Sequence, residues 1–86
     1  MNFLRDSQEL LEVWAGILAD GSYAVILLNR AQSTFPVTAK WAEIGIPSNT
    51  AKVRDLWERK DLGLFVGGFT ADIQGHASRF IKVTPV

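Results

Sequence analysis

The sequence of 86 residues contains no cysteine, and this absence excludes several kinds of site at once. Disulfide bonds, thiolate nucleophiles and cysteine-based zinc sites all require that residue. Histidine is almost as scarce, because His76 is the only one, so a metal site built on two or more histidines is excluded as well. We therefore expect no metal and no other cofactor, while the compartment in which the chain works stays open.

An excess of charge of one sign is also missing. Nine basic and nine acidic residues give a formal net charge of zero. Proteins that bind nucleic acid or anionic lipid surfaces usually carry a basic excess. No stretch reaches the roughly 18 apolar residues of a membrane span, and the first twelve residues hold no apolar run of signal-peptide length. We therefore expect neither nucleic acid nor a membrane as a partner.

What the sequence does contain is the composition of one folded domain. Hydrophobic residues make up 48% of the chain and charged residues 21%, which is typical of a globular domain. A (β/α)₈ barrel needs about 250 residues and does not fit in this length. We interpret residues 1–10 as a polar N-terminal lead-in and residues 11–86 as a single domain.

Short apolar segments separated by turn signals indicate an all-β fold. We expect strands over residues 12–18, 23–28, 35–41, 51–57, 64–73 and 79–83. Asp20-Gly21 predicts a type I′ hairpin turn, residues 59–63 a further turn, and Gly67-Gly68 a bend within the longest segment. Six to eight short strands with turns every 8–12 residues are typical of an antiparallel sandwich or barrel.

The segment from Tyr23 to Leu28 is apolar on both faces of its strand. Such a run predicts burial on both faces, as in a central strand that is covered on each side. A chain this small has little material for a second covering layer, and its zero net charge gives little repulsion between copies. We therefore predict that the isolated chain self-associates, for example as a homodimer.

Strand alternation assigns structural roles to two further residues. Trp41 shares one face with Phe35 and Val37, so we expect it in the core. Asp55 falls on the face of Val53, where a charged side chain is out of place. Either a β-bulge occurs there, or hydrogen bonds hold the carboxylate.

Candidate catalytic groups are few. Two carboxylates about 5–10 Å apart can cleave a glycoside, and Asp55, Asp61 and Asp72 lie in or beside strands. Spacing alone does not show whether any two of them converge, and a structural role is favoured for each. His76 lies in a turn, where we expect its ring to bond the turn backbone. We name no catalytic residue.

Three tryptophans are the remaining feature of note. Besides Trp41, the chain holds Trp14 and Trp57, whose faces the pattern leaves open. Aromatic rings fill cores and interfaces, but a flat ring also packs on the apolar face of a sugar. We therefore consider Trp14 and Trp57 as contacts either for a carbohydrate or for a docking partner.

Ten segments and single residues form a recognisable pattern through their order and spacing, together with Leu18: Glu12–Gly16, Gly21–Val25, Leu28–Arg30, Trp41, Ile44–Ile46, Arg54–Trp57, Lys60–Gly63, Gly68–Ala71, His76 and Phe80–Pro85. This pattern resembles the C-terminal β domain of glycoside hydrolase family 27, the α-galactosidase family. The resemblance extends from about Leu11 to Pro85. One departure is Gln74-Gly75, where many members of the family carry prolines.

The resemblance implies a Greek-key-like antiparallel β-sandwich that packs on a catalytic (β/α)₈ barrel. In that family the two catalytic aspartates belong to the barrel, and no position here matches them. The first functional hypothesis is therefore a non-catalytic accessory domain that stabilises the barrel of an α-galactosidase-type enzyme, which hydrolyses with retention of configuration. The alternative hypothesis is an independent carbohydrate-binding module that uses exposed aromatic side chains.

Overall fold

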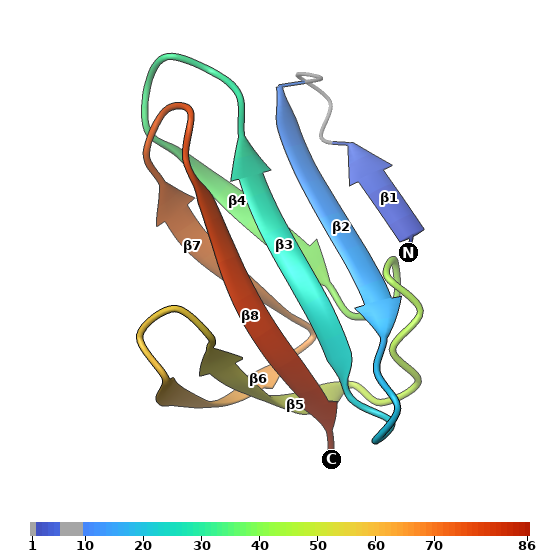
Figure 1. Cartoon of the computed structure of the whole chain (residues 1–86). Coiled ribbons are helices and arrows are strands. Elements are labelled where there is room, and N and C mark those ends of the chain that lie inside the picture. Colours follow the sequence, from blue (N-terminus) through green and yellow to red (C-terminus); the bar gives the residue numbers. More distant parts are fainter. Residues whose placement is uncertain (1, 6–9) are drawn as a thin grey trace.

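The computed structural model describes residues 2–5 and 10–86, with side chains from Leu10 onward. Within this part of the chain, eight strands and no helix form two sheets that face each other (Figure 1). The all-β sandwich predicted from the turn spacing is thus confirmed. The strands are β1 (Asn2–Arg5), β2 (Leu11–Ile17), β3 (Tyr23–Asn29), β4 (Phe35–Lys40), β5 (Thr50–Asp55), β6 (Lys60–Val66), β7 (Gly68–Ile73) and β8 (Ser78–Pro85).

The larger sheet has the strand order β1-β2-β3-β8-β5-β6, and the smaller sheet pairs β4 with β7. Every pair of neighbouring strands is antiparallel. The chain leaves the larger sheet after β3 and again after β6, and β8 then returns between β3 and β5 (Figure 1). This order is Greek-key-like, as the family resemblance implies.

The lead-in expected over residues 1–10 contributes a strand. Residues 2–5 form β1, which pairs with β2 from Asn2 opposite Ala15 to Arg5 opposite Glu12. Phe3 and Leu4 make this segment less polar than we expected, and an edge strand needs only one partner. The larger sheet therefore begins before residue 11, while the division of the chain into a lead-in and one domain stays a proposal.

The hairpin between β2 and β3 lies at Asp20-Gly21 as predicted, but the type I′ assignment is wrong. Gly21 has a φ of 87°, whereas among the described non-glycine residues only Arg59 and His76 have positive φ. The loop instead closes by hydrogen bonds from the Leu18 N–H to the Ser22 carbonyl and from the Gly21 N–H to the Leu18 carbonyl. The Asp20 carboxylate accepts a hydrogen bond from the Ser22 N–H and holds this wider turn.

The second half of the chain also departs from the expected boundaries. β6 begins at Lys60, so the turn lies between Asp55 and Lys60 rather than over residues 59–63. Gly67, with a φ of 79°, separates β6 from β7, and these two strands belong to different sheets. The bend predicted at Gly67-Gly68 is therefore a crossing from one sheet to the other.

The core lies between the two sheets. Trp41 is 1% exposed, and its Nε1–H donates to the Phe65 carbonyl at 3.1 Å. On β3 only one face is fully buried, through Val25 and Leu27, while Ile26 on the other face is half-buried. The expectation that β3 is buried on both faces is thus wrong, because no described layer covers the outer face of the larger sheet.

Candidate interaction surfaces

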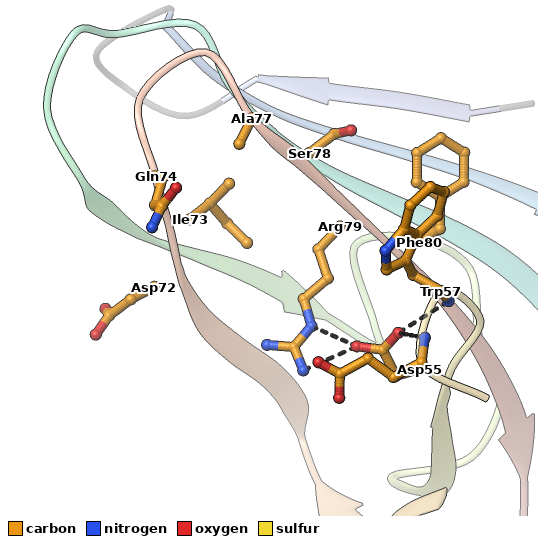
Figure 2. A pocket seen from close by; sticks show the side chains of 10 residues that line it. Asp55, Trp57, Asp72, Ile73, Gln74, Ala77, Ser78, Arg79 and Phe80 are labelled. Atoms are coloured by element: carbon orange, nitrogen blue, oxygen red, sulfur yellow. Dashed lines mark hydrogen bonds and ion pairs between the residues drawn. The ribbon is translucent and has the colours of Figure 1, made fainter. Parts of the chain in front are cut away.

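The end of β5 is organised by the carboxylate of Asp55. Its side chain is 4% exposed and lies on the core side of the strand. Oδ1 accepts hydrogen bonds from the backbone N–H groups of Trp57 and Glu58, both at 2.9 Å. Oδ2 accepts a hydrogen bond from Nε of Arg79 at 3.0 Å and forms an ion pair with Nη2 of the same guanidinium, also at 3.0 Å (Figure 2). Three hydrogen bonds and this ion pair therefore satisfy a carboxylate that the alternation pattern had marked as out of place.

Of the two explanations offered for Asp55 from the sequence, the hydrogen bonds are the one that applies. The register of the β5–β6 pair does shift between Val53 and Arg54, but the extra residue, Leu62, lies on β6, and Asp55 stays on the buried face of Val53. The hydrogen bonds then hold the carboxylate on the apolar face. The backbone N–H of Glu58 lowers the pKa of Asp55, and the Arg79 guanidinium lowers it further, although burial acts in the opposite direction. Asp55 is therefore an ionised structural anchor and is unsuited to act as a general acid.

A surface hollow of about 500 Å³ lies beside this anchor. It opens where β5 ends: Asp55 is opposite Ile81, so residues 78–80 of β8 have no strand neighbour on that side. Figure 2 shows Trp57 and Phe80 on one side of the hollow and Asp72 and Gln74 on the other. The lining residues are Asp55, Trp57, Glu58, Asp72, Ile73, Gln74, Ala77, Ser78, Arg79 and Phe80.

The hollow combines bare aromatic surface with polar groups. Trp57 is 88% exposed and Phe80 is 45% exposed. Arg79 is fixed by Asp55 on one side, and its guanidinium carbon lies 5.8 Å from the centre of the Phe69 ring. None of the described residues accepts a hydrogen bond from its third nitrogen, Nη1, which points away from Asp55 (Figure 2). The hollow can therefore offer both a stacking surface and a preoriented donor.

A second surface crosses the outer face of the larger sheet. Trp14 on β2 is opposite Ile26 on β3, which is opposite Phe80 on β8. Leu56 extends this line, because its N–H donates to the Phe80 carbonyl at 3.1 Å. We call these four residues the outer row. Large apolar side chains in a continuous line on an uncovered sheet face are typical of a protein interface.

Trp14 is anchored within the outer face. Its Nε1–H donates to Oε1 of Glu12 at 3.2 Å, and Glu12 forms an ion pair with Arg30 at 2.9 Å. The Glu12 side chain is buried although it lies outside the main core. Of the two tryptophans left open by the sequence, Trp14 therefore lies half-buried in the outer row, and Trp57 projects at the rim of the hollow.

The remaining residues considered from the sequence as possible catalytic groups, Asp61, Asp72 and His76, lie in different surroundings. Asp61 forms an ion pair with Arg54 at 2.7 Å, whereas Asp72 is exposed at the hollow. His76 has a φ of 61°, and its backbone N–H donates to the Ala31 carbonyl. Its ring makes no hydrogen bond to any described residue, contrary to our expectation. In the part of the chain that the structure describes, no three His, Asp or Glu residues could hold a metal ion.

Two residues of the hollow were not identified from the sequence. Arg79 pairs with Asp55 across 24 positions of the chain, and Phe80 joins the outer row to the hollow. The placement of Asp55 on an apolar face did signal a need for partners. Nothing near Asp55 in the sequence indicated that its basic partner would come from the last strand.

Comparison with known families identifies the domain. Residues 8–83 match the model of the alpha galactosidase C-terminal beta sandwich domain. The chain belongs to this family. The match includes the strand that ends at Asp55 and the strand that supplies Arg79, so both halves of the anchor lie within the family domain. The resemblance noted from the sequence is thereby confirmed.

Relatives of this C-terminal sandwich domain are longer proteins. An alpha-galactosidase from Cyamopsis tetragonoloba is 46% identical over 76 residues, which are 87% of this chain and 18% of that protein. An isomalto-dextranase from Arthrobacter globiformis is 42% identical over 86% of this chain and 12% of its own length. The structure of alpha-galactosidase I from Mortierella vinacea superposes with a TM-score of 0.80 at 34% identity, over 90% of this chain and 22% of that chain. The chain therefore spans less than a quarter of each.

Proposed function

We propose that this domain is a non-catalytic accessory domain that packs on, and stabilises, the catalytic (β/α)₈ barrel of an α-galactosidase-type glycoside hydrolase. The observation that carries the proposal is the partial coverage of the relatives: the Cyamopsis tetragonoloba alpha-galactosidase matches over only 18% of its length. The rest of such an enzyme is long enough for a barrel, whereas 86 residues are not.

The outer row is the surface that we propose for this docking. The strand register places Trp14, Ile26 and Phe80 side by side, and a backbone hydrogen bond places Leu56 next to Phe80; no described layer covers these four residues. Burying apolar surface contributes about 25 cal/mol for each Å² removed from water. A barrel that covers the row would therefore stabilise both domains.

A chimeric enzyme tests this function. The C-terminal sandwich of the Cyamopsis tetragonoloba enzyme is replaced by this chain, and the half-life of α-galactosidase activity is measured during heating. We expect the chimera to outlast a version that is truncated before the sandwich. Equal half-lives of the chimera and the truncated enzyme would contradict the proposal.

A matched pair of substitutions then tests the surface. Ile26→Lys places a charge in the middle of the outer row, whereas Ile17→Lys places one at an exposed position at the end of β2. We expect only Ile26→Lys to shorten the half-life of the chimera. Thermal unfolding of the two isolated variants separates loss of docking from loss of folding.

The alternative function, an independent carbohydrate-binding module, is favoured by one observation. The exposed ring of Trp57 stands at the rim of a hollow that also contains polar side chains. Trp14, by contrast, is half-buried in the outer row. We therefore assign docking to Trp14 and leave carbohydrate contact to Trp57, so one domain can serve both purposes.

A further inference from the structure

The hollow beside Asp55 has the volume of a ligand site. Its volume of about 500 Å³ falls within the range of about 300–1,000 Å³ found for small-molecule pockets. It lies at the flank of the sandwich, where β5 ends, and shares only Phe80 with the outer row. A barrel that docks on the outer row would therefore share only Phe80 with the lining of the hollow.

The backbone of Trp57 is fixed although its ring is exposed. The backbone N–H of Trp57 donates to Oδ1 of Asp55, and the ion pair of Asp55 with Arg79 joins β5 to β8. The indole, which is 88% exposed, thus projects from a turn that is tied to the core. When a ligand stacks on the ring, the turn is already ordered, and only the rotation of one side chain has to be restricted.

The polar groups of the hollow select for a neutral, hydroxyl-rich ligand. Nη1 of Arg79 is a donor without an acceptor among the described residues, and Asp72 and Gln74 supply acceptors on the opposite side. Because Asp55 neutralises Arg79, the exposed carboxylates of Glu58 and Asp72 leave the rim acidic. An anion is therefore disfavoured, whereas sugar hydroxyls can both donate and accept.

We propose that this hollow binds a hexopyranose unit of a carbohydrate. The C–H face of the sugar ring stacks on Trp57, and its hydroxyl groups bond Arg79 and the opposite polar side chains. The choice of galactose rests on the proposed function; a galactopyranoside presents the C–H groups at C3, C4 and C5 on one face because its axial 4-hydroxyl projects from the other. The position of the site, by contrast, follows from the hollow and its lining residues in this structure.

Titration of the ¹⁵N-labelled chain with methyl α-D-galactopyranoside tests the site by NMR. The three indole N–H signals report on three environments, because those of Trp41 and Trp14 are bonded within the protein. We expect the Trp57 signal to shift with a dissociation constant on the order of 1 mM, and the other two to stay in place. No shift of Trp57 at 100-fold that concentration would overturn the proposal.

Three variants locate the binding. In the Trp57→Ala variant, the galactoside should no longer shift the backbone signals of the other residues that line the hollow. Gln74→Ala should weaken binding several-fold. Leu64→Ala, at an exposed apolar position outside the hollow, should leave the affinity unchanged. Each spectrum also shows whether the variant is folded, so a lost signal is not mistaken for lost structure.

A cationic probe tests the alternative ligand, because a rim that is acidic and aromatic could also bind an organic cation. If n-butylammonium shifts the Trp57 signal and the galactoside does not, the hollow takes a cation and the carbohydrate proposal fails. Because these titrations use the isolated chain, such a failure leaves the accessory-domain function intact. That function is tested separately by the heat-treated chimera.

Discussion

Two tryptophans in two regions of this small domain show how differently the same side chain can be used. Trp41 is enclosed between the sheets, and its indole N–H donates to a backbone carbonyl. Trp57 is held by its backbone to Asp55, while its ring lies almost entirely in solvent. In the first region the ring therefore stabilises the fold, whereas in the second the fold positions only the backbone that carries the ring.

Replacing each of these tryptophans should give the largest difference in the free energy of unfolding between the two regions. Trp41→Ala removes a fully buried ring, and we expect a loss of about 3–5 kcal/mol in the free energy of unfolding. So small a domain has a total stability of only about 5 kcal/mol. Trp57→Ala should change it by less than about 0.5 kcal/mol. Urea unfolding monitored by circular dichroism measures both; equal losses would show that the two regions do not differ.

The anchor that positions Trp57 should have the next largest effect. Asp55→Ala leaves two backbone N–H groups and the Arg79 guanidinium without their acceptor. Leaving buried hydrogen-bonding groups unsatisfied costs about 1–3 kcal/mol. We expect the same urea experiment to show a loss in this range. An exposed control, Asp61→Ala, removes an ion pair at the surface and should cost less than about 1 kcal/mol.

The pH dependence of the free energy of unfolding tests whether the ionised carboxylate of Asp55 stabilises the fold. Its pKa is lowered in the folded state from an unfolded value of about 3.9. Its contribution is therefore complete above pH 4 to 5 and is lost as the pH falls through the folded pKa. Asp55→Asn should flatten the acid side of the stability curve. Asp20, whose pKa is also lowered by its bonds to Ser22, should continue to contribute a slope; an unchanged curve for Asp55→Asn would contradict this assignment.

Self-association is the smallest effect that we expect. No described layer covers the outer row, in which Phe80 is 45% and Leu56 40% exposed, and the zero net charge offers little repulsion. Sedimentation equilibrium at rising protein concentration should show a weak dimer, and Ile26→Lys should weaken it more than Ile17→Lys. A strictly monomeric chain at millimolar concentration would show that the outer row is not self-complementary.

How much of this structure the sequence predicts depends on whether a feature is local. Alternation along residues 35–41 placed Trp41 on the inner face, and Asp20-Gly21 located a hairpin. Asp55 was recognised as a residue that needs partners. The type of that hairpin turn was missed because side-chain bonds of Asp20 favour a wider loop.

The features that stayed hidden depend on contacts between distant strands. The pairing of Asp55 with Arg79 follows from β8 lying beside β5, and the hollow follows from β5 ending opposite Ile81. The exposure of Trp57 results from the same ending. None of these has a signature in residue spacing, because strand order is decided by the packing of the whole sheet.

The position of β8 also determines when this domain can assemble during its synthesis. β8 is the last of the described strands to leave the ribosome, yet it lies between β3 and β5 in the larger sheet. Until then the strands β1 to β3 and the hairpin of β5 and β6 have no shared edge in that sheet. Such late, non-local pairing slows folding. The larger sheet can therefore be completed only when Ser78–Pro85 pairs with β3 and β5.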